Sequence, residues 1–449
     1  MANIAPQRGR TPSNKSERAP RPEMKELDGA LEIHAAYLAG SAGAGKLLLV
    51  DYDLSERDLS GRDFSKADLT RINLQRAILV KTMFMGTRLF AADLSGAILN
   101  GADLTEADLR GAIFRGAQLN GAILARANLT QANLDSDDAS SMSGRRRRTD
   151  LSAIQAHGVD MSGAKLEDAV VMQSDFTDAV MRNVNLEGAD VRNSNFTGAV
   201  LEGANLATAK FQGVNLEGAV LISAKLSGAE FEGANVSGAV LDAGVLEKSQ
   251  FRNTLKAEYA TWTDDQLAEA IKLHALWQAS GGKEGRRADL RKLDLSGKLL
   301  EGVELGLATA SLAKLNETKL SRALLAMADF SMADLRKVVL VGADLRGAKM
   351  FRTHLHEADL TGANLSPLKV IGGGGRELPS NLERARFVSA KLTGANLQRA
   401  NLVGADFSKA DLTNADLSGA RLDNANFTGA RIDGAKLEGA NVETAKGLP

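Results

Sequence analysis

The sequence is poor in several residue types on which ordinary globular folds depend. Its 449 residues include no cysteine, 7 prolines and only 4% aromatic residues. The lack of cysteine excludes disulfides and thiolate metal sites. So few aromatic side chains are unlike a normal globular core, which is filled with large residues of varied size. No run of 18 apolar residues occurs, so we expect no membrane-spanning helix.

An excess of charge of either sign is also missing. The chain has 55 Lys and Arg against 56 Asp and Glu, a formal net charge of -1, which argues against a dedicated nucleic-acid binder. The N-terminus has no apolar core of a signal peptide, so the expected location is cytoplasmic. Residues 1–22 are rich in Pro, Ser, Asn and Arg and are predicted to form a disordered basic tail.

A five-residue repeat fills most of the remaining chain. An apolar residue, most often Leu or Phe, returns every fifth position in four runs: Leu54–Leu134, Leu151–Phe251, Leu290–Leu365 and Leu382–Val442. Ala often stands two positions before this centre, and Gly often stands two positions after it. Such self-similarity is typical of repeat architectures, in which each unit packs on its neighbours.

A period of five fits neither an α-helix nor a flat strand. It fits a chain that turns a corner every five residues, with the central residue and the Ala two positions earlier pointing inward. Phenylalanine fixes the number of sides, because Phe211, Phe231 and Phe251 occupy central positions and are separated by four pentapeptides each time. Such a step stacks these rings above one another only if each coil has four sides.

The pattern Ala-[Asp/Asn]-[Leu/Phe]-x-x, as in Ala102-Asp103-Leu104-Thr105-Glu106, resembles the pentapeptide-repeat family. The resemblance implies an all-β solenoid, a right-handed quadrilateral parallel β-helix. It covers all four runs, but it names no single function, because this fold hosts many roles.

A larger duplication lies above the pentapeptide. Residues 31–37 align without gaps with residues 271–277, and a Gly/Ser-rich stretch and a repeat run follow each segment. Thr263 and Gln266 form a capping box that starts a helix in the second copy. A solenoid end exposes apolar layers and unpaired strand edges, so we expect these two short α-helices to be caps; a partner-binding helix is the alternative.

These observations predict five segments. They are a tail at 1–22, a cap helix and connector at 23–46, a first solenoid at 47–251, a second helix and connector at 252–289, and a second solenoid at 290–449.

One interruption breaks each solenoid. The spacing from Leu134 to Leu151 equals that from Leu365 to Leu382, and both exceed a normal pentapeptide step by twelve residues. The extra residues are predicted to bulge outward as loops 135–150 and 366–381. The candidate interaction residues in these loops are Arg145, Arg146, Arg147, Arg148 and Arg376. In topoisomerase-protecting members of the family, bulged loops contact the target, and the resemblance implies such a role here. The alternative is a loop whose acidic and basic ends neutralise each other.

No residue pattern points to catalysis. Residues 40–46 match the GxxxxGK part of a phosphate-binding loop, but Leu47 stands where Ser or Thr would hold magnesium. His354 and His356 flank Leu355 and are expected to point outward, and two imidazoles do not make a metal site. We therefore expect no enzyme, no metal and no cofactor.

Two functions remain. The first is a protein-interaction scaffold for an unknown protein partner. The second, implied by the family, is a DNA-mimicking modulator of a type II topoisomerase; residues 151–251 hold 13 acidic and 6 basic side chains, a local charge of -7. Nucleic-acid binding through the tail and residues 145–148 has little support. A homodimer through the C-terminal solenoid end is a further expectation.

Overall fold

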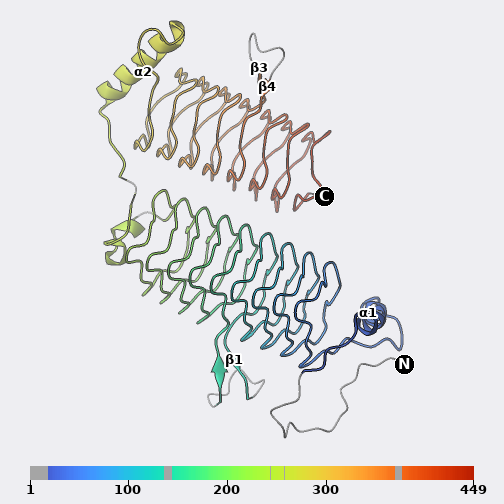
Figure 1. Ribbon diagram of the computed structural model, residues 1–449. Coiled ribbons are helices and arrows are strands. Elements are labelled where there is room, and N and C mark those ends of the chain that lie inside the picture. Colours follow the sequence, from blue (N-terminus) through green and yellow to red (C-terminus); the bar gives the residue numbers. More distant parts are fainter. Residues whose placement is uncertain (1–18, 136–143, 243, 257, 370–376, 449) are drawn as a thin grey trace. The chain divides into compact units, whose positions relative to one another are not determined.

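The computed structural model describes residues 19–135, 144–242, 244–256, 258–369 and 377–448. The chain divides into two compact units, Met1–Lys256 and Ala257–Pro449 (Figure 1). Most of the predicted disordered tail, residues 1–18, lies outside the described residues. The end of that tail is attached to the first unit, because Asp53 N donates a hydrogen bond to Pro20 O at 2.9 Å. Among the described residues, no helix is long and apolar enough to cross a membrane.

Both units are stacks of four-sided coils, visible as successive rungs in Figure 1. Parallel bridges join each residue before a central position to its equivalent one coil on, as in Ile78–Ile98 and Val200–Val220. Within an uninterrupted run, each bridge spans four pentapeptides, as the Phe spacing predicts. Central Leu and preceding Ala side chains are buried, so the inside of each coil is a layer of alternating large and small apolar groups.

The corners and the polar residues of the motif have structural roles. In nearly every pentapeptide the second residue after the centre adopts a positive φ, for example 54° at Asn183, which is the conformation that lets the chain turn. The Asp or Asn before the centre accepts a hydrogen bond from the backbone two residues on, as Asp103 Oδ1 does from Thr105 N at 2.9 Å. This local bond mimics a turn, so the regularly spaced carboxylates hold the backbone in place.

The phenylalanine series form stacked columns inside the coils. Phe211 lies 4.9 Å from Phe231, and Phe231 lies 4.5 Å from Phe251, measured between ring centroids. In the second unit Phe407 lies 4.8 Å from Phe387 and 5.0 Å from Phe427. The four-sided prediction is confirmed in both units.

Helix α1, Met24–Leu38, covers the first coil of the first unit, and its buried residues are Leu27, Ala30 and His34. The His34 ring is fully buried. Its Nδ1 accepts a hydrogen bond from Leu47 N at 3.1 Å, so the proton is on Nε2, which donates to Ser65 O at 2.8 Å. Two backbone groups at the open end of the solenoid are thereby satisfied by one side chain.

Helix α2, Asp264–Ala279, repeats this arrangement in the second unit. Its Thr263–Gln266 capping box is present. His274 Nδ1 accepts from Ala288 N at 3.0 Å, and Nε2 donates to Gly306 O at 2.9 Å. The two copies are therefore related by the same buried contacts, in addition to the aligned sequence.

The first unit ends differently from the predicted run of repeats. Its last residues form two short 3₁₀ helices, η1 at Val245–Glu247 and η2 at Ser249–Phe251. Leu246, which the repeat predicts as a buried centre, is only partly buried and packs against the core. Leu255 nevertheless bridges Asn235. The 3₁₀ segment therefore replaces part of the last coil without changing the register of the coils.

The register of the coils corrects the predicted length of the first insertion. Ile113 bridges Asp150, whereas an uninterrupted coil would pair it with position 133, so this insertion adds seventeen residues. Lys349 bridges Asn381 in place of position 369, so the second insertion adds twelve. The first insertion begins one pentapeptide earlier than residue 135, because Leu134 does not occupy a central position in a coil. The two insertions are therefore not of equal length.

Candidate interaction site

The first insertion leaves the solenoid as a β-hairpin, visible beside the label β1 in Figure 1. Strand β1, Ala132–Asn133, pairs antiparallel with β2, Arg146–Arg147. Thr149 fixes its base: the fully buried hydroxyl donates to Thr130 O at 2.8 Å and accepts from Gly111 N at 2.9 Å. We call the described residues 131–135 and 144–147 hairpin 1.

An outward-facing aromatic residue anchors hairpin 1 to the solenoid. Phe90 follows a central Leu and so points away from the coil interior, yet it is only 3% exposed. It forms a small separate cluster with Ala91 and Ala132, against which Leu134 packs. Leu134 thus covers Phe90 on the outside of the solenoid, and hairpin 1 is held by apolar contacts at its base.

Gly111 allows the close approach of hairpin 1. A Cβ atom at this position would lie 2.5 Å from Ala132 Cβ and 3.2 Å from Arg147 O. Ala132 Cβ is bonded directly to the backbone and Arg147 O is part of it, so no side-chain rotation can move either atom away. Any side chain at residue 111 must displace the base of hairpin 1.

The structure places the four predicted arginines in different environments. Arg145 is 80% exposed and binds Asp135 through its backbone N at 2.8 Å and through its guanidinium at 3.0 Å. These bonds hold the pKa of Asp135 below its usual value. Arg146 is exposed on β2, and the Arg148 guanidinium donates to Asp168 O. Among the described residues of this insertion, Asp135 and Arg145 pair as the alternative of neutralising acidic and basic ends predicts.

Arg147 lies against the solenoid. Burial lowers its pKa, although the Asp93 carboxylate acts in the opposite direction. Its Nε and Nη2 atoms are buried and have no hydrogen-bond acceptor among the described residues. Nearby, the guanidinium carbons of Arg88 and Arg110 lie 5.9 and 5.3 Å from the centre of the Phe90 ring.

The second insertion forms a smaller hairpin. Strand β3, Leu368–Lys369, pairs antiparallel with β4, Glu377–Leu378, and Ser380 holds its base as Thr149 does, accepting from Gly347 N at 2.9 Å. The predicted residue Arg376 lies outside the described residues. The described part of this hairpin carries one ion pair, between Glu377 and Arg399 at 2.5 Å.

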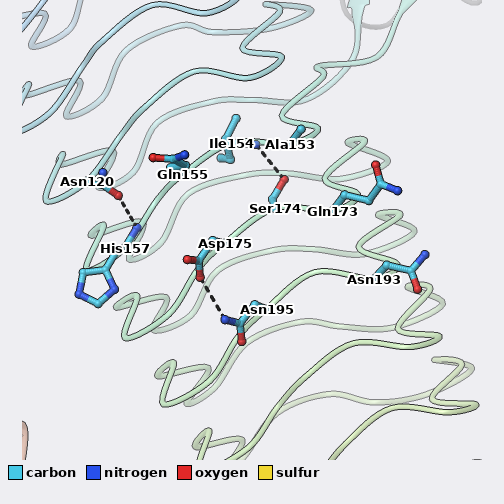
Figure 2. Close-up of a pocket in the computed structure, with 10 residues that line it drawn as sticks. All are labelled: Asn120, Ala153, Ile154, Gln155, His157, Gln173, Ser174, Asp175, Asn193 and Asn195. Atoms are coloured by element: carbon cyan, nitrogen blue, oxygen red, sulfur yellow. Dashed lines mark hydrogen bonds between the residues drawn. The ribbon is translucent and has the colours of Figure 1, made fainter.

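A shallow hollow of about 800 Å³ lies on a different part of the first unit (Figure 2). Amide, hydroxyl and carboxylate groups from four successive coils line it, and many of them bond to one another. His157 N donates to Asn120 Oδ1 at 3.0 Å, and Asn195 Nδ2 donates to Asp175 Oδ1 at 3.3 Å. Among its lining residues no nucleophile lies beside a base. The lining groups therefore offer hydrogen-bond donors and acceptors, and many of these are already bonded to one another.

The prediction that His354 points outward into solvent is wrong. Its ring is 3% exposed, between Asp334 and Arg386 in the same ladder. Burial, together with the neighbouring Arg386, lowers its pKa to about 3. His356 bonds to Glu357 Oε1 at 3.0 Å instead. Within the described residues, no group of three or more His, Cys, Asp or Glu side chains is arranged to hold a metal ion.

A known family model matches the repeat runs of this chain. The family model described as pentapeptide repeats matches residues within 53–136, 160–238, 328–366 and 380–443, which together make up more than half of the chain. The chain belongs to the pentapeptide-repeat family. Its fold is accordingly the right-handed quadrilateral β-helix that the repeat pattern implies.

Several solved pentapeptide-repeat structures are similar to this chain. HetL from the cyanobacterium Nostoc sp. strain PCC 7120, involved in the regulation of heterocyst differentiation, is 24% identical, with 91% of this chain and 94% of HetL covered and a TM-score of 0.20. QnrB1, a plasmid-mediated fluoroquinolone resistance protein, is 15% identical, with 53% and 98% covered and a TM-score of 0.25. The family assignment rests on the repeat match alone. No curated protein matches the sequence.

Within this pentapeptide-repeat protein, the sequence signal for the base of hairpin 1 is Phe90. It is a large aromatic residue directly after a centre, where the motif normally has a polar side chain. Thr149 stands two positions before Leu151, where the motif normally has Ala, but Thr82 and Thr87 occupy the same position in uninterrupted coils. The role of Thr149 is therefore visible only in the structure.

Proposed function

We propose that this pentapeptide-repeat protein is a non-enzymatic, cytoplasmic scaffold that binds an acidic surface of a partner protein through hairpin 1. The observation that carries the proposal is that hairpin 1 is fixed at its base, by Phe90 and Thr149, while Arg145 and Arg146 are exposed beyond it. A fixed hairpin loses little conformational entropy when it binds. Guanidinium groups on such an element favour carboxylates and phosphates.

The charges on the first unit support a scaffold over a DNA mimic. A mimic needs a continuous acidic face, and residues 151–251 have an excess of acidic groups. However, one ladder reads Asp190, Lys210, Glu230, and another reads Val180, Val200, Val220 and Val240, with no charge. Arg192 also neutralises Asp190 at 2.7 Å. Such a patchwork suits recognition of a particular protein surface better than imitation of a phosphate backbone.

The binding role of hairpin 1 is tested by purifying full-length protein with its partners from the native cell, followed by measurement of affinity for each purified partner. Changing both Arg145 and Arg146 to Ser is expected to weaken binding by about tenfold or more, since the loss of charged hydrogen bonds costs ~1.5–3 kcal/mol. Gly111→Ala keeps every charge but displaces the hairpin base, and it should also weaken binding. Deletion of residues 135–150 is unsuitable, because it removes the buried Thr149.

Two controls make this test specific. Arg399→Ser removes an arginine from the second unit and should leave binding unchanged. Addition of DNA distinguishes the scaffold from the DNA mimic. The scaffold proposal is wrong if the recovered partner is a topoisomerase that DNA releases and that still binds the double variant.

A homodimer through the C-terminal end of the second unit is a separate proposal. The last described coil there leaves apolar groups partly open: Ile432 and Leu437 are half-buried, and Val442 is 40% exposed. If two copies meet there, light scattering of the full chain should give twice the monomer mass. Val442→Asp should restore the monomer, and a monomeric mass for the wild-type protein would rule this interface out.

A further inference from the structure

One two-bond geometry recurs among the arginine–aspartate pairs of this protein. Arg110 binds Asp108 with Nε to one oxygen at 2.8 Å and Nη2 to the other at 2.7 Å. Arg336 uses the same two atoms on Asp334, at 2.8 and 2.7 Å. The same geometry is present in Arg192–Asp190, Arg291–Asp289, Arg346–Asp344 and Arg71–Asp51. The Nε/Nη2 edge is the planar fork that matches a carboxylate.

The same edge of Arg147 has no carboxylate. Both Nε and Nη2 are buried, and neither finds an acceptor in the part of the chain that the structure describes. Buried donors are almost always paired, so two vacant donors on one edge of one guanidinium require an explanation. The side chain as a whole is only half-buried, so a rotation about its flexible chain can turn this edge toward solvent.

Among the described residues, the acidic groups around the hairpin base already have bonds of their own. Asp93 is the carboxylate that acts electrostatically on Arg147. It already accepts hydrogen bonds from Ser95 N at 3.0 Å and Gln75 Nε2 at 2.6 Å. Asp108 is bound by Arg110. These two carboxylates are therefore committed to other groups.

The other charges near the hairpin base are largely balanced. Arg88 and Arg110 lie over the Phe90 ring, but Asp108 bonds Arg110 and is the neighbour of Arg88 in one ladder. The attraction of this edge for an anion therefore comes from Arg147 itself, because hydrogen bonds from a guanidinium to an anion are about twice as strong as neutral ones.

We propose that the Nε/Nη2 edge of Arg147 is a binding site for a carboxylate, supplied by an Asp or Glu side chain of the partner that docks on hairpin 1. This inference rests on the proposed function, and it adds that recognition depends on a two-bond fork at the hairpin base. Arg145 and Arg146 attract the acidic partner, and Arg147 fixes one of its carboxylates. The recurring arginine–aspartate forks in the chain favour a carboxylate over a phosphate.

The test uses the full-length protein and a labelled peptide of six glutamates with blocked ends, so that only side-chain carboxylates are available. Binding is measured by fluorescence anisotropy. Arg147→Lys keeps the positive charge but removes the fork, and it is expected to weaken binding about tenfold. The matched control Arg146→Lys makes the same chemical change on the exposed side of β2 and should weaken binding less than threefold. Circular dichroism should show both variants folded with unchanged thermal stability, since the Arg147 edge holds no partner among the described residues.

Equal weakening by Arg147→Lys and Arg146→Lys would show that only overall charge matters, and it would overturn the inference. So would failure of the wild-type protein to bind the peptide. Two competitors distinguish the sources of the anion. Acetate should displace the peptide weakly from the wild-type protein. It should not displace the peptide that still binds to the Arg147→Lys variant. If inorganic phosphate displaces it much better than acetate, the site is for phosphate and the assignment to a carboxylate is wrong.

The outcomes also separate this inference from the proposed function. If the partner from the cell still binds Arg147→Lys normally but is lost when Arg145 and Arg146 are changed, hairpin 1 is the docking element and the carboxylate fork is wrong. If the peptide depends on Arg147 but no partner depends on hairpin 1, the site exists and the scaffold proposal is wrong.

Discussion

Replacing His34 with alanine is expected to lower the free energy of unfolding of the first unit by about 3–5 kcal/mol. The change leaves Leu47 N and Ser65 O without their partner, and each unsatisfied buried group costs ~1–3 kcal/mol. It also opens a cavity beneath helix α1, because the ring is fully buried, and large-to-small core changes cost ~2–5 kcal/mol. Urea denaturation followed by circular dichroism measures the loss.

A control on the same helix isolates the role of the imidazole. Ile33 precedes His34 and is 39% exposed, so Ile33→Ala removes apolar surface without touching the end of the solenoid. It should change the stability by less than about 1 kcal/mol. If both substitutions had the same small effect, the histidine would not be holding the end of the coil. His274→Ala should repeat the large effect in the second unit, where the bonds are the same.

The same histidine makes stability depend on pH. Burial lowers the pKa of His34 from its usual 6.5, and the nearby Lys46 acts in the same direction. The Ser65 hydrogen bond and the Asp63 carboxylate oppose this shift. Burial likewise lowers the pKa of His274, with Arg287 acting in the same direction. Because the folded pKa lies below the unfolded pKa, the unfolded chain binds more protons between them.

The contribution of each histidine is therefore complete above about pH 6.5 and decreases as the pH falls toward the folded pKa, at up to ~1.4 kcal/mol per pH unit. His34→Ala and His274→Ala should each flatten this part of the stability curve. Carboxylates such as Asp411, whose pKa of about 2 is set by bonds from Thr413 and Arg431, lose their contribution only in more acidic solution. The two effects occupy different pH ranges.

Repetition made the fold predictable, because each coil repeats the same choice of inward and outward residues. A period of five, apolar centres and Phe at steps of four pentapeptides determine a four-sided stack without any long-range information. The caps were predictable in position, since α1 and α2 lie where the aligned segments place them. Their chemistry was less so, because the buried bonds of His34 depend on Leu47 and Ser65, which lie far along the chain.

The repeat pattern leads to a wrong prediction at the base of hairpin 1. Leu134 is apolar and stands one pentapeptide after Leu129, so it satisfies the repeat rule. In the structure it packs outside the coil against the Phe90 cluster, because β1 has already left the solenoid at Ala132. An apolar residue at the correct spacing does not distinguish the inside of a coil from a cover on its outside. The vacant edge of Arg147 follows from the same departure and has no counterpart in the repeat pattern.

The core of the second unit gives the other large expected effect. Phe407→Ala should lower its stability by about 3–5 kcal/mol, as for other buried aromatic residues changed to alanine. Phe407 is fully buried between Phe387 and Phe427, with ring centroids 4.8 and 5.0 Å away. The substitution removes contacts with both neighbouring coils at once, and in a solenoid these nearest-neighbour contacts carry the cooperativity.

Phe351 provides the matched control. It follows a centre and points outward, and the Arg352 guanidinium carbon lies 4.9 Å from the centre of its ring. Phe351→Ala should cost clearly less than Phe407→Ala, because the Phe351 ring is only partly buried and a cation–π contact at an accessible site is worth about 0.5–1 kcal/mol. A double-mutant cycle of Phe387 and Phe407 should give a coupling energy of ~0.5–1.5 kcal/mol from the stacked pair. Hydrogen exchange should then increase first in the coils that contain residues 387–427, since neighbouring coils rely on the missing ring; uniform exchange along the unit would mean that the stack does not couple them.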